Sequence, residues 1–231
     1  MTTTQPHYSS VLFSRLRAAT LDDWKSYIDH EFVHRLGDGT LPKSAFLHYL
    51  RQDYVYLHHY ARAFALGVVK AGSLEETRLC AEIMHGLTVT ELPLHVGICA
   101  REGISEDDLY NTREEPENLA YTRYVLDCGQ AGDFLDLLTA LVPCAHGYGE
   151  IGVNLAASAK AGTPYQEWID AYAGADYQEI CHKVGKLFDQ AAMNRLGPDF
   201  ESSPRWPKLC QIFATASRLE ANFWSMGLKG A

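Results

Sequence analysis

Apolar residues recur three and four positions apart through most of the 231-residue chain, which is the spacing of one buried face of an α-helix. No segment shows the sustained alternation of apolar and polar residues that marks a half-buried β-strand. The pattern therefore predicts an all-α fold, a single-domain multi-helix bundle over residues 1–231, with a flexible tail over about the first eight. One such apolar face follows Leu41-Pro42 and consists of Phe46, Leu50, Leu57, Ala61, Phe64 and Val68.

Turn and capping residues between the apolar repeats give the expected helix boundaries. Proline is tolerated in the first turn of a helix, so Pro42 is expected to open a long one. Ser73 and Glu76 form a capping box that starts the next helix, and Pro93 predicts a kink within it. Thr163 is expected to cap a later helix. The expected helical segments are 9–36 (as one or two helices), 42–71, 73–101, a short turn from 105, 117–128, 134–157, 163–173, 176–196 and 207–226.

Composition is that of a soluble globular protein. Hydrophobic residues make up 47% and charged residues 21%, which is enough apolar side chain for a sizeable core. The net charge of −9 argues against binding nucleic acid or an anionic membrane through non-specific electrostatics. No apolar run of about 18 residues predicts a membrane span, and residues 1–7 lack the pattern of a signal peptide. The expected compartment is the cytosol.

The six cysteines contain no C-x-x-C pair, so their spacing fits neither a zinc ribbon nor a short disulfide framework. In a reducing cytosol they are expected to be free thiols, most of them packing residues and one of them a candidate nucleophile. They are Cys80, Cys99, Cys128, Cys144, Cys181 and Cys210.

One expected helix carries an unusual series of residues. Pro143 lies inside it, Cys144 follows, and Tyr148 lies one turn later on the same face. Three glycines within 147–152 each cost about 1 kcal/mol of helix propensity relative to alanine. Two interpretations stay open: a tight helix crossing with Cys144 as a small buried hydrophobe, or a nucleophile beside room for a ligand. His146 falls on the far side of the helix, so it is a poor candidate for the cysteine's base.

Asp53 shares one helix face with Tyr49, Tyr56 and Tyr60, because the four positions are spaced by four, three and four. A carboxylate among aromatic rings is costly to bury unless a group donates hydrogen bonds to it. Either the phenols satisfy Asp53, or Asp53 holds a polar ligand inside an aromatic cage.

Glu220 lies on one helix face with Phe223 and Trp224. Aromatic neighbours remove water from a carboxyl group and favour its protonated form, which suits a general acid or base working near neutral pH. The alternative is a partly exposed glutamate that covers the tryptophan ring.

Two E-x-x-H pairs indicate a different chemistry. Glu31 and His34 form one pair, and Glu179 and His182 form the other. In a helical bundle such pairs, with a glutamate from each of two further helices, describe a carboxylate di-iron site. His34 lies one turn before a Gly-Asp-Gly stop, which is a poor place for a buried ligand. The candidate glutamates are Glu91, Glu150 and Glu220.

Four separate stretches agree in order and spacing with one family. They are Gly37-Asp38-Gly39-Thr40-Leu41-Pro42, Gln52-Asp53-Tyr54-Val55-Tyr56-Leu57, Pro143-Cys144 with Tyr148, and Glu220 with Phe223-Trp224. Over roughly residues 20–228 the chain resembles the TenA family, whose members are thiaminase II or aminopyrimidine aminohydrolase enzymes. The resemblance implies an all-α bundle like that of haem oxygenase, usually assembled as a homotetramer.

The activity that the resemblance implies belongs to thiamin salvage. The group on the 5-methylene of 4-amino-2-methylpyrimidine is replaced by hydroxyl, giving 4-amino-5-hydroxymethyl-2-methylpyrimidine. The leaving group is the amine of 4-amino-5-aminomethyl-2-methylpyrimidine or the thiazolium of thiamin. The implied partner is this small pyrimidine, with no metal, organic cofactor, nucleic acid or membrane.

Carried over by position, three residues resemble the family's catalytic residues. Cys144 resembles the nucleophile that adds to the ring, Asp53 the carboxylate that holds the 4-amino group and a ring nitrogen, and Glu220 the acid/base at the opposite ring nitrogen. Residues 145–147 replace a bulkier run of the family, which leaves the leaving-group preference open. The residues implied to line the pocket are Tyr56, Tyr121, Tyr148, Tyr172 and Phe223, with Tyr124 close enough to take the place of Tyr121.

Two other functions stay open at this point. One is the haem-oxygenase-like di-iron enzyme that the E-x-x-H pairs describe, and the other is a non-catalytic ligand-binding or regulatory protein. The acidic charge and the lack of a basic recognition helix weigh against direct DNA binding.

Overall fold

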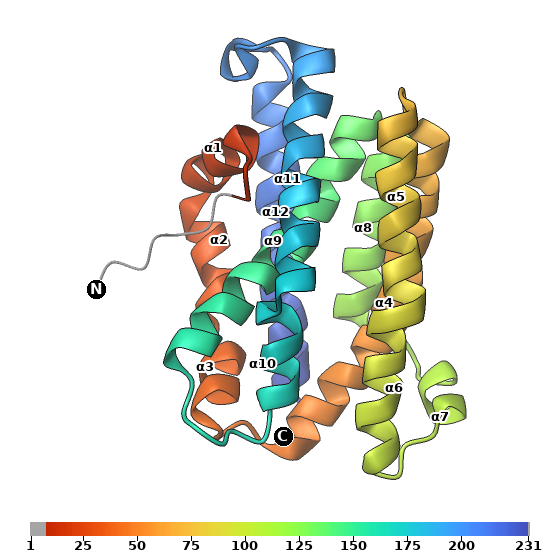
Figure 1. Ribbon diagram of the computed structural model, residues 1–231, viewed down its shortest axis with the longest axis vertical. Helices are drawn as coiled ribbons and strands as arrows, with labels where there is room; N and C mark the ends of the chain where they lie inside the picture. The colour runs from red at the N-terminus through yellow and green to blue at the C-terminus, as the bar shows by residue number, and fades with distance from the viewer. Residues whose placement is uncertain (1–7, 231) are drawn as a thin grey trace. The chain divides into compact units, whose positions relative to one another are not determined.

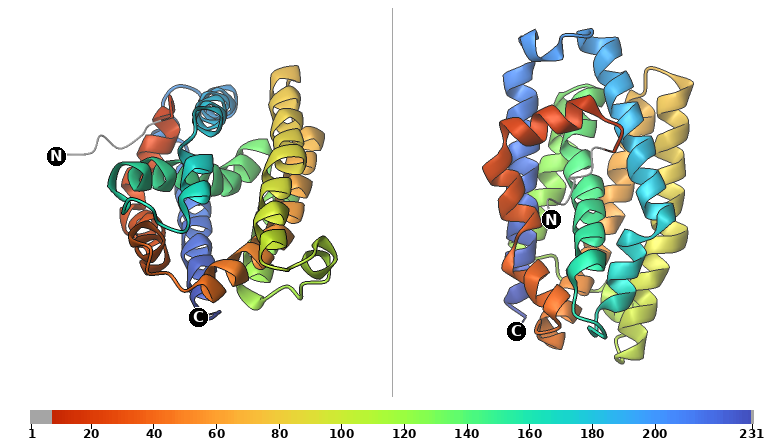
Figure 2. Two further views of the ribbon diagram at one scale, coloured as in Figure 1. Left: turned by 60° about the horizontal axis from the view of Figure 1, so that its bottom comes forward. Right: turned by 60° about the vertical axis from the view of Figure 1, so that its left-hand side comes forward.

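The computed structural model describes residues 8–230, and every regular element in that range is helical (Figures 1 and 2). The predicted all-α class is confirmed. Of the expected flexible tail, residues 1–7 lie outside the described range, whereas Tyr8 is buried. The helices are α1 (Val11–Ala19), α2 (Leu21–Ile28), α3 (Glu31–Asp38), α4 (Lys43–Lys70), α5 (Leu74–Gly86), the π-helical turn η1 (Leu87–Glu91), α6 (Leu92–Arg101), α7 (Glu106–Tyr110), α8 (Pro116–Ala131), α9 (Phe134–Ser158), α10 (Gln166–Ala173), α11 (Ala175–Leu196), the 3-10 turn η2 (Phe200–Ser202) and α12 (Trp206–Leu228).

Two helix boundaries differ from the prediction for local reasons. The segment 9–36 holds α1, α2 and most of α3, one helix more than expected. The His30 side chain accepts a hydrogen bond from the backbone N–H of Phe32 (3.1 Å) and so starts α3. The prediction that Thr163 caps α10 is wrong. Its hydroxyl donates to the Leu36 carbonyl (2.9 Å), and α10 begins three residues later at Gln166.

The interruption expected at Pro93 takes the form of the π-helical turn η1. Pro93 is the second residue of α6 and has no N–H to donate to the carbonyl of Val89, four residues before it. The wider turn lies where a regular α-helical bond cannot form. The chain passes from α5 through η1 into α6 with helical backbone angles at both junctions.

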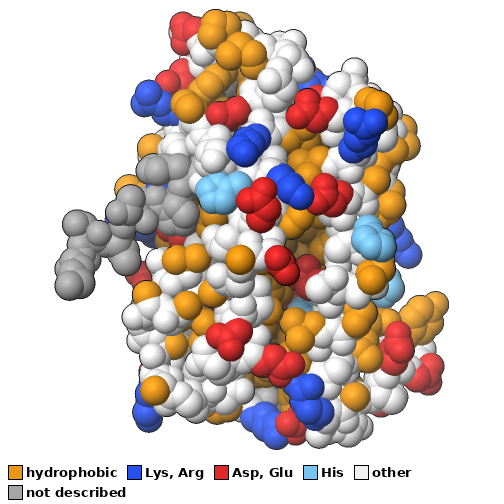
Figure 3. Space-filling model, in the orientation of Figure 1, with side chains coloured by type: hydrophobic (Ala, Val, Ile, Leu, Met, Phe, Trp, Pro, Cys, Tyr) orange, Lys and Arg blue, Asp and Glu red, His pale blue; other side chains and the backbone are white. Residues whose placement is uncertain are grey.

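Charged residues of both signs are mixed on the face drawn in Figure 3, where Lys and Arg side chains lie among Asp and Glu. Among the described residues of that face, Lys and Arg side chains form no continuous basic surface of the kind that binds a nucleic acid backbone. Within residues 8–230, none of the helices has the length and apolar character needed to cross a membrane.

The contacts of the described residues group them into two compact units. The first unit consists of residues 8–41 and 138–221, and the second of residues 42–137 and 222–230. Each unit is assembled from stretches that are distant in the sequence. The expectation of a single domain stays a prediction.

In the first unit, α1 and α10 each pack against α11. Asp189 of α11 accepts hydrogen bonds from the Ser10 hydroxyl (2.6 Å) and from the backbone N–H groups of Val11 (2.8 Å) and Leu12 (2.9 Å). First-turn N–H groups have no acceptor within their own helix. Asp189 therefore caps α1 and ties its start to α11.

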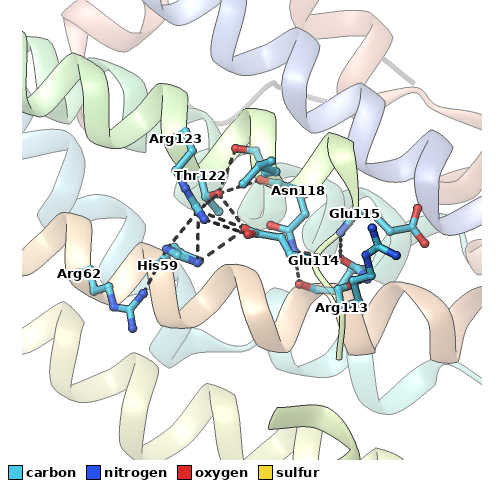
Figure 4. Close-up of polar contacts among 10 residues, drawn as sticks. His59, Arg62, Arg113, Glu114, Glu115, Asn118, Thr122 and Arg123 are labelled. Carbon is cyan, nitrogen blue, oxygen red and sulfur yellow. Dashed lines mark hydrogen bonds and ion pairs between the residues drawn. The ribbon is translucent and has the colours of Figure 1, made fainter. Parts of the chain in front are cut away.

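In the second unit, α5, α6, α7 and α8 all pack against the long helix α4. Asn118 of α8 donates from its amide nitrogen to the backbone carbonyl (2.8 Å) and side-chain carbonyl (3.1 Å) of Gln52 in α4. Arg123 forms a two-point ion pair with Glu114 (2.9 and 3.2 Å) beside His59 (Figure 4). The Asn118–Gln52 hydrogen bonds, with the approach of Arg123 to His59 of α4 (3.3 Å), hold α8 against the part of α4 that carries the candidate carboxylate.

Candidate functional site

Cys144, the candidate nucleophile, lies on α9 in the first unit, directly after a proline within the helix. The residue is only 7% exposed. One turn later on α9, the ring centroid of Tyr148 lies 5.0 Å from that of Tyr172 on α10. Two of the residues predicted to line the pocket are therefore in contact within this unit.

The glycines of α9 are points of close approach. A Cβ placed on Gly147 would lie 2.1 Å from the ring of Tyr27, and one on Gly152 would lie 2.6 Å from the backbone carbonyl carbon of Tyr172. Gly149 is enclosed in a similar way. Tight packing around α9 therefore accounts for the glycines, and it leaves the role of Cys144 undecided.

Gly152→Ala is expected to destabilise the protein by about 1–3 kcal/mol, because the obstructing atoms are backbone and cannot rotate away as a side chain can. For a chain of this length the loss corresponds to a fall in Tm of about 2–12 °C, measured by differential scanning calorimetry. The matched control is Gly86→Ala, since Gly86 has helical φ (−57°) and open space at its Cβ position. The control is expected to keep or raise Tm. An unchanged Tm for Gly152→Ala would contradict the close approach.

His146 is fully buried, and its imidazole is engaged in packing. Nε2 donates a hydrogen bond to the carbonyl of Cys181 (3.0 Å), and the ring lies 4.6 Å from that of Tyr8 and 4.5 Å from that of Phe13. Burial lowers the pKa of His146 to about 3, so the ring is neutral near pH 7. Its contacts are those of a structural residue of the first unit.

Glu150 belongs to a buried ion pair. The Arg17 guanidinium lies 3.1 Å from Glu150 Oε2, and the Trp24 indole N–H donates to the same oxygen at 3.3 Å. Burial raises the pKa of Glu150, and the charge of Arg17 acts in the opposite direction. Both donors converge on one carboxylate oxygen, so Glu150 has a structural task.

The di-iron alternative finds no ligand set in the structure. Glu31 and His34 are both exposed, with Glu31 paired to the next turn of its own helix and His34 lying 2.7 Å from Asp29. Glu179 is exposed as well. Among residues 8–230, no three His, Cys, Asp or Glu side chains are grouped so that they could hold a metal ion.

Asp53, the candidate substrate-binding carboxylate, lies on α4 in the second unit and is 2% exposed. The Tyr49 hydroxyl, one turn earlier, donates a hydrogen bond to Asp53 Oδ2 (3.0 Å). Nδ1 of His95, from α6, lies 3.4 Å from the same oxygen. Tyr49 is therefore one phenol that satisfies Asp53, as the first interpretation expected. The second interpretation, in which Asp53 also binds a ligand, stays a prediction.

Aromatic rings gather in the second unit around Tyr49, the hydrogen-bond donor of Asp53, and the ring centroid of Tyr49 lies 6.1 Å from that of Phe223 on α12. The ring of Tyr56 stacks on Tyr121 of α8 (5.0 Å between centroids, 25° between planes) and meets the edge of Phe223 on α12 (5.6 Å). Tyr121 is almost fully buried, whereas Tyr124 is only half-buried. Of the two tyrosines that the sequence left open, Tyr121 is the one in the aromatic group.

Glu220, the candidate acid/base, lies on α12 in the first unit and is 2% exposed. The prediction of a buried carboxyl is therefore favoured over a partly exposed one. The second unit brings Asp53, Tyr56, Tyr121 and Phe223 together, and the first unit holds Cys144, Glu220 and the Tyr148–Tyr172 pair. That all of these residues act on one substrate stays a prediction.

Sequence reasoning missed His95 as a neighbour of Asp53. No sequence rule links residues 53 and 95, which lie 42 positions apart. The available signal was a histidine on the apolar side of α6, which predicts burial but not the partner.

The chain is similar to known proteins over nearly its whole length. A model of the TENA/THI-4/PQQC family matches residues 17–230. An aminopyrimidine aminohydrolase from Halalkalibacterium halodurans is 38% identical over 205 residues, which cover 88% of this chain and 89% of that protein. The crystal structure of a TenA family transcription regulator from Silicibacter sp. TM1040 is 51% identical and has a TM-score of 0.94, covering 98% of this chain and 99% of that one.

A more distant structure extends the likeness at the level of the fold. A domain of unknown function from Shewanella denitrificans, described as having a haem oxygenase-like fold, has a TM-score of 0.71 at 16% identity. It covers 94% of this chain and 92% of that one. The predicted resemblance to the haem oxygenase fold is confirmed.

Proposed function

The chain belongs to the TENA/THI-4/PQQC family, and from that premise we propose that it is a cysteine-dependent hydrolase of thiamin salvage. The proposed substrate is 4-amino-5-aminomethyl-2-methylpyrimidine, with thiamin as the alternative, and the product is 4-amino-5-hydroxymethyl-2-methylpyrimidine. The name of the relative from Halalkalibacterium halodurans, aminopyrimidine aminohydrolase, supports this class of reaction.

The observation that carries the proposal is the buried carboxylate of Asp53 beside stacked aromatic rings. A 4-aminopyrimidine is a flat ring with an amino group and a ring nitrogen on one edge. Aromatic faces suit the ring, and a carboxylate accepts hydrogen bonds from the amino group and from a protonated ring nitrogen. Asp53 is therefore proposed to bind and orient the substrate.

The proposed reaction begins when the Cys144 thiolate forms a bond to a carbon of the pyrimidine ring while Glu220 gives a proton to a ring nitrogen. The electron-rich ring then expels the amine from the methylene carbon, and the amine leaves with the bonding pair and takes up a proton. Water adds to the resulting exocyclic methide. Departure of the cysteine sulfur and loss of the proton from the ring nitrogen restore the aromatic ring.

The direct test is turnover by the purified protein. Product release from the aminopyrimidine and from thiamin is followed by liquid chromatography with mass detection. Formation of hydroxymethylpyrimidine from either compound is the expected result. Absence of product from both, by a folded protein, would refute the proposal.

Asp53→Asn is expected to lower kcat/KM for the aminopyrimidine by about 10–100-fold, because the amide offers a donor where the substrate presents donors of its own. Most of the loss should appear in KM, since Asp53 holds the substrate in the ground state as well. Steady-state kinetics check this, with Asp127→Asn as control because Asp127 is an exposed aspartate of the same unit. Equal effects of the two substitutions would contradict a binding role.

A regulatory function is the remaining alternative, since the Silicibacter relative is described as a transcription regulator. The net charge of −9 weighs against it because DNA binding relies on cationic contacts to phosphate. A mobility shift with genomic DNA fragments at physiological salt, together with absent turnover, would favour regulation over hydrolysis.

A homotetramer in the cytosol completes the proposal. Size-exclusion chromatography with light scattering should give a mass four times that of one chain. Fractionation of the native cells should recover the protein with the cytosolic fraction, and recovery with another fraction would contradict that compartment.

A further inference from the structure

His95 is a buried imidazole to which the proposed mechanism assigns no task. The residue is 0% exposed, and burial lowers its pKa to about 4, so the ring is neutral near pH 7. Neither ring nitrogen has a hydrogen-bond partner within residues 8–230. Buried polar groups in folded proteins nearly always have one, so the position of His95 calls for an explanation.

One acceptor lies within reach of the ring. His95 Nδ1 is 3.4 Å from Asp53 Oδ2, longer than an ordinary hydrogen bond, and the Tyr49 hydroxyl donates to that same oxygen at 3.0 Å. A neutral imidazole carries one N–H and one lone pair, and a lone pair facing a carboxylate oxygen is repelled. The contact therefore selects the tautomer of His95 with the proton on Nδ1.

We propose that His95 is a positioning residue for Asp53, whose Nδ1–H closes onto Oδ2 when a 4-aminopyrimidine engages the carboxylate. The inference rests on the proposed function of Asp53. Contacts between catalytic groups are often long or poorly aligned in a ligand-free enzyme and shorten in the complex. With two donors on one oxygen, the carboxylate is held in one orientation as an anion that accepts the substrate's N–H groups. His95 acts through Asp53 and does not itself touch the reacting atoms.

The competing explanation is that His95 only fills space in the second unit. Two substitutions separate the explanations, because asparagine can place an amide N–H near the position of Nδ1 and phenylalanine fills the volume without a donor. His95→Phe is expected to lower kcat/KM for the aminopyrimidine about 10–100-fold, mainly through KM, and His95→Asn to stay within about fivefold of wild type. A pure packing role predicts the opposite order, since phenylalanine preserves the volume better.

A double-substitution cycle tests whether the effect passes through Asp53. In the Asp53→Asn background the loss caused by His95→Phe should shrink to less than about threefold, because its partner has been removed. An undiminished loss in that background would overturn the proposal. Thermal melts of all four proteins show whether each is folded, and product binding by calorimetry supplies the affinity wherever turnover is too slow.

Nuclear magnetic resonance of protein labelled with 15N-histidine tests the same inference without any substrate. The His95 signals are assigned by their loss in His95→Asn, and the expected state near pH 7 is neutral with the proton on Nδ1. A charged ring, or a proton on Nε2, would overturn the proposal. If the wild type turned over no pyrimidine, the proposed function would fail. The tautomer would still show, without any substrate, whether His95 directs its Nδ1–H at Asp53.

Discussion

Cys144→Ala is expected to lower kcat for the aminopyrimidine by about 10³–10⁵-fold, because it removes the thiolate with which the proposed reaction forms a bond to the ring. The residues around Asp53 that are proposed to bind the substrate are untouched, so the product should still bind with an affinity near that of wild type. Rapid-quench or steady-state assays measure the first effect and calorimetry the second.

Cys210→Ala is the matched control for this experiment. Cys210 is a half-buried free cysteine on α12, in the same unit as Cys144, and burial raises the pKa of its thiol. Its removal is expected to leave kcat within about twofold of wild type. Retention of more than about a tenth of the activity by Cys144→Ala would exclude covalent catalysis by this residue.

Arg17→Met is expected to cause the largest loss of stability. It removes the cation from a fully buried carboxylate, and breaking a buried ion pair in this way typically costs about 3–5 kcal/mol. For a chain of this size the Tm should fall by about 6–20 °C. The double substitution Arg17→Met with Glu150→Gln removes the stranded charge and should recover most of the loss.

The deficit of Arg17→Met should depend on pH in a defined direction. Burial raises the pKa of Glu150, so this group favours folding while it is protonated, and that contribution is lost as pH rises through the raised pKa. Arg17 lowers the same pKa, so removing Arg17 raises the pKa of Glu150 further. The stability that Glu150 contributes while protonated is then lost over a pH range that extends higher. The fall in Tm should therefore be larger at about pH 8 than at about pH 5, and the reverse order would contradict the assignment.

Local periodicity accounts for the parts of the structure that the sequence predicted well. The turn spacing of α4 places Tyr49 one turn before Asp53, so their hydrogen bond follows from helical geometry alone. The helical class and most helix boundaries follow from the same period, because apolar spacing decides the buried face of each helix.

Contacts between distant residues could not be predicted in this way. Arg17 and Glu150 are 133 positions apart, and nothing in either segment indicates the other. The stacking of Tyr56 on Tyr121 and the approach of His95 to Asp53 depend likewise on how α8 and α6 pack on α4. Family resemblance supplied part of this information, since it names residues that act together, but it did not supply His95.

The π-helical turn η1 makes the packing of this chain sensitive to the deletion of a single residue. A π turn contains one residue more than an α-helical turn, and one residue of an α-helix corresponds to a rotation of about 100°. α5 and α6, on either side of η1, both pack against α4. Deleting one residue between 87 and 91 would rotate α6 by about 100° relative to α5. Such a variant could preserve the packing of α5 on α4 or the approach of His95 to Asp53, but not both. Aligned relatives that lack this residue should therefore place a different side chain beside their counterpart of Asp53.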